Sequence, residues 1–129
     1  MRSFFLFFVL FFSFGFTTVF SQTDSLQILS VAHFNRVLQL NSNVELIDVS
    51  SKKEFRKAHI LGAFSAPSSK DLYQRIDSLG SSKVYLLYCK YGDRSIDAGI
   101  MIFEKYHIPV CLLEGGLDAW LQAGKEVEN

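Results

Sequence analysis

Short, continuously apolar segments alternate with helical patterns along most of this chain, and this alternation limits the possible folds more than any other feature. The predicted strands are Val44–Val49, Ala63–Ala66, Lys83–Tyr88 and Val110–Leu113. Strands that are apolar along their length are typical of a parallel sheet covered on both faces. Alternating strands and helices predict an α/β fold. We therefore expect one domain with a mostly parallel central sheet flanked by helices on both faces.

Five helices are predicted from the spacing of apolar residues and from capping residues. The first begins after Ser30, and the others lie at Ser51–Ala58, at Leu72–Leu79, at Ser95–Tyr106 and at Leu117–Ala123. The third helix should bury Leu72, Ile76 and Leu79. The fourth should present Ile96, Ile100 and Phe103 to the core.

Cys89 is the residue that the order of strand, loop and helix most clearly predicts to be reactive. The segment Tyr88–Ser95 joins a buried strand to a helix, and Cys89 is the first residue after the apolar run. The thiolate form of a cysteine is the nucleophile, and free N–H groups at a helix start stabilise it. Gly92 allows the loop to turn its N–H groups inward, and Arg94 adds a positive charge. The local pattern fits a phosphate site and a reactive thiol equally well.

Further charged residues lie at the carboxyl ends of the predicted strands, and therefore at the same edge of the sheet. Asp48 and Glu114 end two other strands, and ligands of parallel α/β sheets bind at this edge. We expect Arg94 to form an ion pair with Asp48 that supports the loop. His59 is interpreted as a structural hydrogen-bonding residue, not as a catalytic base.

The two cysteines are not expected to form a disulfide. If their strands are parallel neighbours, Leu113 or Glu114 lies level with Cys89, which places Cys111 roughly 7–10 Å away. Bridged cysteines need Cα atoms within about 7 Å of each other. Cys111 is therefore predicted to be a buried apolar residue, and a thiol redox function would need this disulfide.

The amino-terminal segment differs from the rest of the chain. Residues 1–20 contain nine of the 13 Phe residues and one charge, Arg2. A basic start, an apolar run and small residues near Ser21 predict a signal peptide at residues 1–21, cleaved before Gln22, and a periplasmic or secreted protein. If it were uncleaved, the 17-residue run Phe4–Phe20 would be at the short limit for a membrane helix. Residues 22–27 are expected to be a loose leader.

The balance of charges excludes one class of partner. The chain has 13 basic and 13 acidic residues, and no basic patch favours nucleic acid. No cofactor and no metal is expected.

Five motifs follow one another along the chain: Leu46–Val49, Glu54–Phe55, His59–Ala63, Cys89–Ser95, and Leu113–Gly116 with Trp120 and Ala123–Gly124. In this order they resemble the rhodanese family. The resemblance covers residues 28–127 and implies a single rhodanese-like domain.

The resemblance also implies a chemistry. Cys89 would take sulfur from a donor such as thiosulfate, become a persulfide, and pass the sulfur to a thiol, cyanide or a protein acceptor. The loop would bind the substrate through Lys90, Tyr91, Gly92, Asp93, Arg94 and Ser95. The second function left open is a non-enzymatic module with this fold that binds a partner or carries sulfur.

Loop length separates this chemistry from that of the similar cell-cycle phosphatases. Those enzymes place five residues between Cys and Arg, whereas four separate Cys89 from Arg94 here. Asp93 would also repel a phosphate dianion. The sequence departs from the family pattern at Ser50, where Arg is usual, and at Ala58, where Gly is usual. Glu54 is then expected to pair with Arg56 or Lys53.

Overall fold

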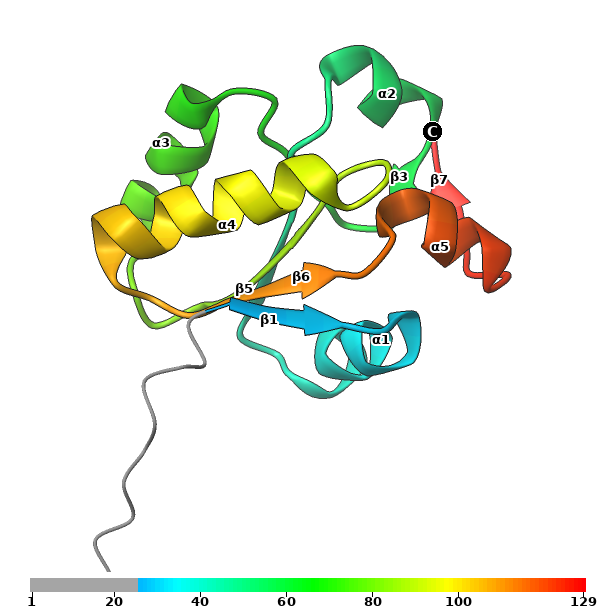
Figure 1. Ribbon diagram of the computed structural model, residues 1–129, viewed down its shortest axis with the longest axis horizontal. Coiled ribbons are helices and arrows are strands. Elements are labelled where there is room, and N and C mark those ends of the chain that lie inside the picture. The colour runs from blue at the N-terminus through cyan, green and yellow to red at the C-terminus, as the bar shows by residue number, and fades with distance from the viewer. Residues whose placement is uncertain (1–25) are drawn as a thin grey trace, which may run out of the picture.

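The computed structural model describes residues 26–129 (Figure 1). In chain order its elements are β1 (Leu26–Leu29), α1 (Val31–Leu40), β2 (Val44–Asp48), α2 (Lys52–Lys57), β3 (His59–Ile60), β4 (Phe64–Ser65), α3 (Ser69–Leu79), β5 (Val84–Tyr88), α4 (Asp93–Tyr106), β6 (Val110–Leu113), α5 (Gly116–Gln122) and β7 (Val127–Glu128).

The central sheet has the strand order β1-β6-β5-β2-β4, and every neighbouring pair in it is parallel. The small strands β3 and β7 form a separate antiparallel pair. The predicted α/β fold with a mostly parallel sheet is therefore confirmed. Strand β5 lies in the middle of the sheet, so the loop that follows it opens at the centre of the carboxyl edge.

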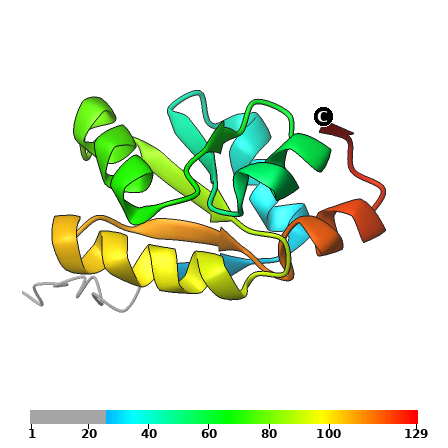
Figure 2. The same cartoon turned by 90° about the horizontal axis from the view of Figure 1, so that it is seen from above.

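Strand β5 is buried on both faces because helices cover both (Figure 2). Tyr85 and Leu87 join a core cluster with residues of α3 and α4. Leu86 and Tyr88 point to the opposite face and join a cluster with residues of α1 and α5. Burying an apolar side chain of this size stabilises the fold by roughly 1.5–3 kcal/mol. Two cores thus fix the strand that ends at Tyr88, directly before Cys89.

Strand β1 was not predicted from the sequence. The leader was expected to include Leu26 and Gln27, but both belong to this edge strand, which pairs with β6. The strand is hard to recognise because Gln27 and Ile28 are exposed, so only its ends contact the core. The predicted signal peptide, its cleavage position and residues 22–25 lie outside the described residues.

The residues that α3 and α4 bury can be compared with those predicted from the spacing of apolar residues. Leu72 and Ile76 are buried in α3 and Leu79 packs against them, as expected. The prediction for α4 was wrong, because Ile96 and Ile100 are more than one-third exposed. Its buried residues are Ser95, Ala98, Gly99 and Ile102.

The face that α4 buries is set by close approach to the sheet. A Cβ atom at Gly99 would lie 2.6 Å from the Leu26 Cδ2 atom, so a larger residue here would require the Leu26 side chain of β1 to move. No helix among residues 26–129 has the length and apolar character that crossing a membrane requires.

Candidate active site

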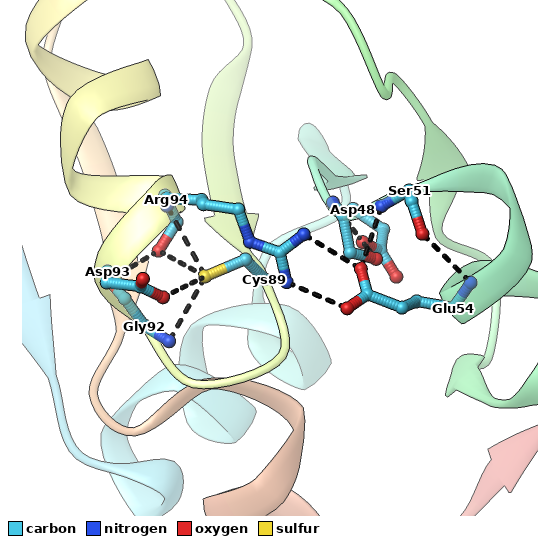
Figure 3. A network of polar contacts seen from close by, with 9 residues as sticks. Asp48, Ser51, Glu54, Cys89, Gly92, Asp93 and Arg94 are labelled. Atoms are coloured by element: carbon cyan, nitrogen blue, oxygen red, sulfur yellow. Dashed lines mark hydrogen bonds and ion pairs between the residues drawn. The ribbon is translucent and has the colours of Figure 1, made fainter.

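The sulfur of Cys89 is enclosed by the loop between β5 and α4 (Figure 3). Cys89 has no exposed surface. The backbone N–H groups of Gly92 and Ser95 donate to its Sγ atom at 3.1 Å and 3.4 Å. Gly92 reaches this position with φ of 97°, in the left-handed region that favours glycine. Two donors aimed at one sulfur favour negative charge on it.

Polar side chains complete the surroundings of the sulfur. Its Sγ atom lies 3.7 Å from Ser95 Oγ and 3.8 Å from Asp93 Oδ1. Ser95 is buried, and its hydroxyl donates to the Gly92 carbonyl at 3.1 Å, which ties the loop to the first turn of α4. The Asp93 carboxylate therefore places a negative charge beside the sulfur.

The side chains of Lys90 and Tyr91 point outward. Both residues are exposed, and the Lys90 Nζ atom lies 5.2 Å from the centre of the Tyr91 ring. What these two residues supply to the interior of the loop is therefore their backbone.

Helix α5 holds the backbone of the loop from outside. The N–H of Leu117 donates to the Cys89 carbonyl at 2.8 Å, and the N–H of Asp118 donates to the Lys90 carbonyl at 2.9 Å. Figure 1 shows the loop beside the start of α5. Because the C=O and N–H of one peptide unit point in opposite directions, these bonds turn the N–H groups of Lys90 and Tyr91 away from α5.

Gly116 allows the start of α5 to lie this close to the cysteine loop. Its φ is 62°, and a Cβ atom there would overlap the Cys89 carbonyl oxygen and lie 2.7 Å from the Lys90 carbonyl carbon. The Gly115–Gly116 turn is thus the surface on which the cysteine loop rests.

Arg94 extends from the start of α4 to Glu54 of α2 (Figure 3). Its Nη1 and Nη2 atoms donate to Glu54 Oε2 and Oε1 at 2.8 Å and 3.1 Å, a bidentate ion pair. Hydrogen bonds from Arg94 and from the N–H of Ser51 lower the pKa of Glu54 to about 2. The Glu54 carboxylate in turn raises the pKa of Arg94. The bridge joins the reactive loop to α2.

The expected ion pair between Arg94 and Asp48 was wrong, as was the expected pairing of Glu54 with Arg56 or Lys53. Asp48 lies level with Tyr88 in the parallel sheet, so its side chain points to the face opposite α4. Its Oδ1 atom instead accepts hydrogen bonds from the N–H and the hydroxyl of Ser50. Asp48 is buried and shapes the start of the α2 segment, not the cysteine loop.

His59 has the structural role that was predicted. Its ring is buried and stacks on Phe55 with 3.7 Å between ring centres. The Nδ1 atom is 2.7 Å from the Phe55 carbonyl oxygen, and Nε2 is 3.1 Å from Glu128 Oε1. The residue thus fastens α2 to β7.

The register of the sheet also confirms the expected separation of the cysteines. Leu86 pairs with Cys111 and Leu87 with Leu112, so Cys111 lies three positions before the level of Cys89. Both cysteines are free. Cys111 is partly buried rather than fully buried, and this burial raises the pKa of its thiol. Among residues 26–129, no group of three His, Cys, Asp or Glu side chains is placed to hold a metal ion.

Sequence reasoning missed two parts of the site. One is the role of Glu54 as the ion-pair partner of Arg94. The sequence signal at this position is a capping box, in which Ser51 and Glu54 each accept a hydrogen bond from the other's backbone N–H. The other is the support of the loop by the N–H groups of Leu117 and Asp118, which leaves no mark in side-chain chemistry.

The fold agrees with the comparisons to known proteins. A family model described as Rhodanese-like domain matches residues 34–123, so the chain belongs to the rhodanese-like domain family. The Bacillus subtilis protein called Uncharacterized protein YqhL is 36% identical over 76 residues, covering 59% of this chain and 60% of that protein.

Two similar proteins are named for an activity. The Thiosulfate sulfurtransferase GlpE of Shewanella oneidensis is 26% identical over 91 residues, covering 69% of this chain and 89% of that protein. The crystal structure of a thiosulfate sulfurtransferase from Pseudomonas aeruginosa superposes with a TM-score of 0.71 at 25% identity, covering 80% of this chain and 19% of the other.

Replacement of Gly116 tests the support of the loop. We expect Gly124→Ala, a control with φ of 72° and no atom within 4 Å of the added Cβ, to cost about 1–2 kcal/mol of folding free energy. Gly116→Ala should cost clearly more, because the backbone of Cys89 and Lys90 must also move. Urea unfolding of both variants measures this, and equal costs would contradict a close contact between the turn and the loop.

The Arg94–Glu54 bridge predicts a dependence of stability on pH. The pKa of Glu54 is lowered from 4.5 to about 2, so its contribution is present above pH 4.5 and is lost as the pH falls from 4.5 through about 2. The free energy of unfolding of the wild type should therefore exceed that of Glu54→Gln at pH 6, and the difference should shrink toward pH 2. Glu104→Gln removes an exposed carboxylate of α4 and is the matched control. A difference that does not change with pH would disprove the charged bridge.

Proposed function

We propose that this protein is a sulfurtransferase that carries sulfur on Cys89. The observation that carries the proposal is the buried Sγ atom facing the N–H groups of Gly92 and Ser95 at the carboxyl edge of a parallel sheet. The negative charge lies on Sγ before the first transfer and on the terminal sulfur after it, and donors of this kind stabilise such charge. Membership of the rhodanese-like family supports the same chemistry.

The reaction has two balanced steps. The Cys89 thiolate attacks the outer sulfur of a donor such as thiosulfate, the sulfur–sulfur bond of the donor breaks, and sulfite leaves with the electron pair. The terminal sulfur of the resulting persulfide is then attacked by a thiolate or cyanide, and the Cys89 thiolate is regenerated. Both steps are written from thiolates, so neither transfers a proton and neither needs a cofactor or a general base.

The roles of the loop residues follow from their positions. The N–H groups of the loop, from Lys90 to Ser95, would surround the terminal sulfur and the donor anion. Arg94 would add positive charge while Glu54 holds its guanidinium in place. Asp93 holds its carboxylate 3.8 Å from the sulfur, so negative charge on the sulfur is stable only where the N–H donors and Arg94 offset this repulsion.

We also propose that residues 1–21 direct export, which would place the sulfur chemistry in the periplasm or outside the cell. The proposal is supported by the basic start, the apolar run and the small residues near Ser21.

The export proposal predicts the amino terminus of the secreted protein. When the full chain is produced in a host with a general secretion pathway, the exported protein should begin at Gln22. Amino-terminal sequencing and the intact mass measure this. A chain that keeps residues 1–21 would contradict cleavage.

The chemical proposal predicts a change in mass at one residue. Incubation of the purified chain with thiosulfate should add the mass of one sulfur atom to the wild type and to Cys111→Ser, and none to Cys89→Ser. Adding a thiol or cyanide should remove the sulfur and release persulfide or thiocyanate over many cycles. Removal in a single cycle would indicate a sulfur carrier instead of an enzyme, and no gain with several donors would disprove both.

A further inference from the structure

A cavity of about 500 Å³ lies between α2 and α5 beside the cysteine loop. It touches the site at Glu54, the partner of Arg94, at Lys90, the neighbour of Cys89, and at Leu117, whose N–H holds the Cys89 carbonyl. The two steps of sulfur transfer assign no role to the other residues that line the cavity.

The wall of the cavity carries a surplus of positive charge. Lys53 and Lys57 lie four residues apart in α2, and Lys90 faces them from the loop. Glu54 is the single carboxylate among the described residues that line the cavity, and it is engaged by Arg94 and by the N–H of Ser51. Within residues 26–129, no carboxylate forms an ion pair with these lysines.

Apolar groups line the rest of the cavity. Ala58, Leu117 and Leu121 contribute this surface, and Leu121 is 45% exposed. The volume falls within the roughly 300–1,000 Å³ typical of sites for small organic ligands. Cyanide would fill only a small part of it, so the cavity suits a larger acceptor.

We propose that this cavity binds the sulfur acceptor, and that the acceptor is a small organic thiol carrying at least two carboxylates. The proposal rests on the sulfurtransferase function proposed above. The carboxylates would lie against Lys53 and Lys57, and the carbon chain would lie on Leu117 and Leu121. The acceptor thiolate attacks the terminal sulfur of the Cys89 persulfide, the sulfur–sulfur bond breaks, and the organic persulfide leaves while the Cys89 thiolate reforms.

Two acceptors that differ in charge test the proposal. Mercaptosuccinate has two carboxylates and 2-mercaptoethanol has none, and kcat/KM is measured for each with thiosulfate as donor. The selectivity for mercaptosuccinate over 2-mercaptoethanol should fall roughly tenfold in the double variant Lys53→Gln, Lys57→Gln, since two ion pairs are lost. The same selectivity should fall in the wild type as the salt concentration rises.

A double variant with the same net charge is the control. Lys52→Gln, Lys70→Gln removes two exposed lysines that do not line the cavity, and its selectivity should change less than twofold. Circular dichroism and thermal unfolding establish that each variant is folded. If the selectivity falls equally in both double variants, the effect comes from the overall charge of the protein and the proposal is overturned. Unchanged selectivity in both double variants would also overturn it.

A binding measurement separates this inference from the proposed function. Calorimetry with the Cys89→Ser chain measures mercaptosuccinate binding without sulfur transfer, and the Kd should rise roughly tenfold when Lys53 and Lys57 are also replaced. If the wild type gains no sulfur from thiosulfate while this binding is present, the sulfurtransferase proposal fails and the cavity stands as a binding site for anions. If the wild type gains sulfur while mercaptosuccinate does not bind, only the acceptor assignment fails.

Discussion

Two hydrogen bonds from the start of α5 hold the carbonyl groups of Cys89 and Lys90, and the geometry of the cysteine loop depends on them. A loop of four residues between a strand and a helix has many possible shapes. With its first two carbonyls fixed from outside, its following N–H groups are turned inward, where a negatively charged sulfur needs them. The glycine turn before α5 is therefore as important to the site as the loop itself.

The rest of the fold brings these two segments together. Strand β5 is central and buried on both faces, so Cys89 emerges at the middle of the sheet edge. The neighbouring strand β6 is parallel to it, which carries the Gly115–Gly116 turn to the same edge. On the other side, the ion pair of Arg94 with Glu54 attaches the loop to α2. The loop is thus held at both ends by elements distant in sequence.

The sequence was sufficient to predict the features that depend on local chemistry and on sheet register. Apolar runs revealed the strands β2, β5 and β6, and a strand end followed by a helix start located Cys89. The distance of Cys111 from Cys89 followed from parallel pairing, because register in such a sheet is fixed by residue count.

Features that depend on side-chain direction and on packing could not be predicted in the same way. Arg94 and Asp48 meet the same edge of the sheet, yet Asp48 shares the face of Tyr88, so Glu54 is the partner of Arg94. The buried face of α4 includes Gly99, which lies close to the side chain of Leu26 in β1. Since β1 is an exposed edge strand, its own pattern gave no warning of that contact.

A crystal structure of the thiosulfate-treated chain tests the central claim most directly. The account predicts one additional sulfur bonded to Cys89 Sγ, within hydrogen-bonding distance of the loop N–H groups, with the Leu117 and Asp118 bonds to the loop carbonyls intact. A treated chain in which Cys89 is unmodified, or in which the extra sulfur points away from the loop N–H groups, would contradict it.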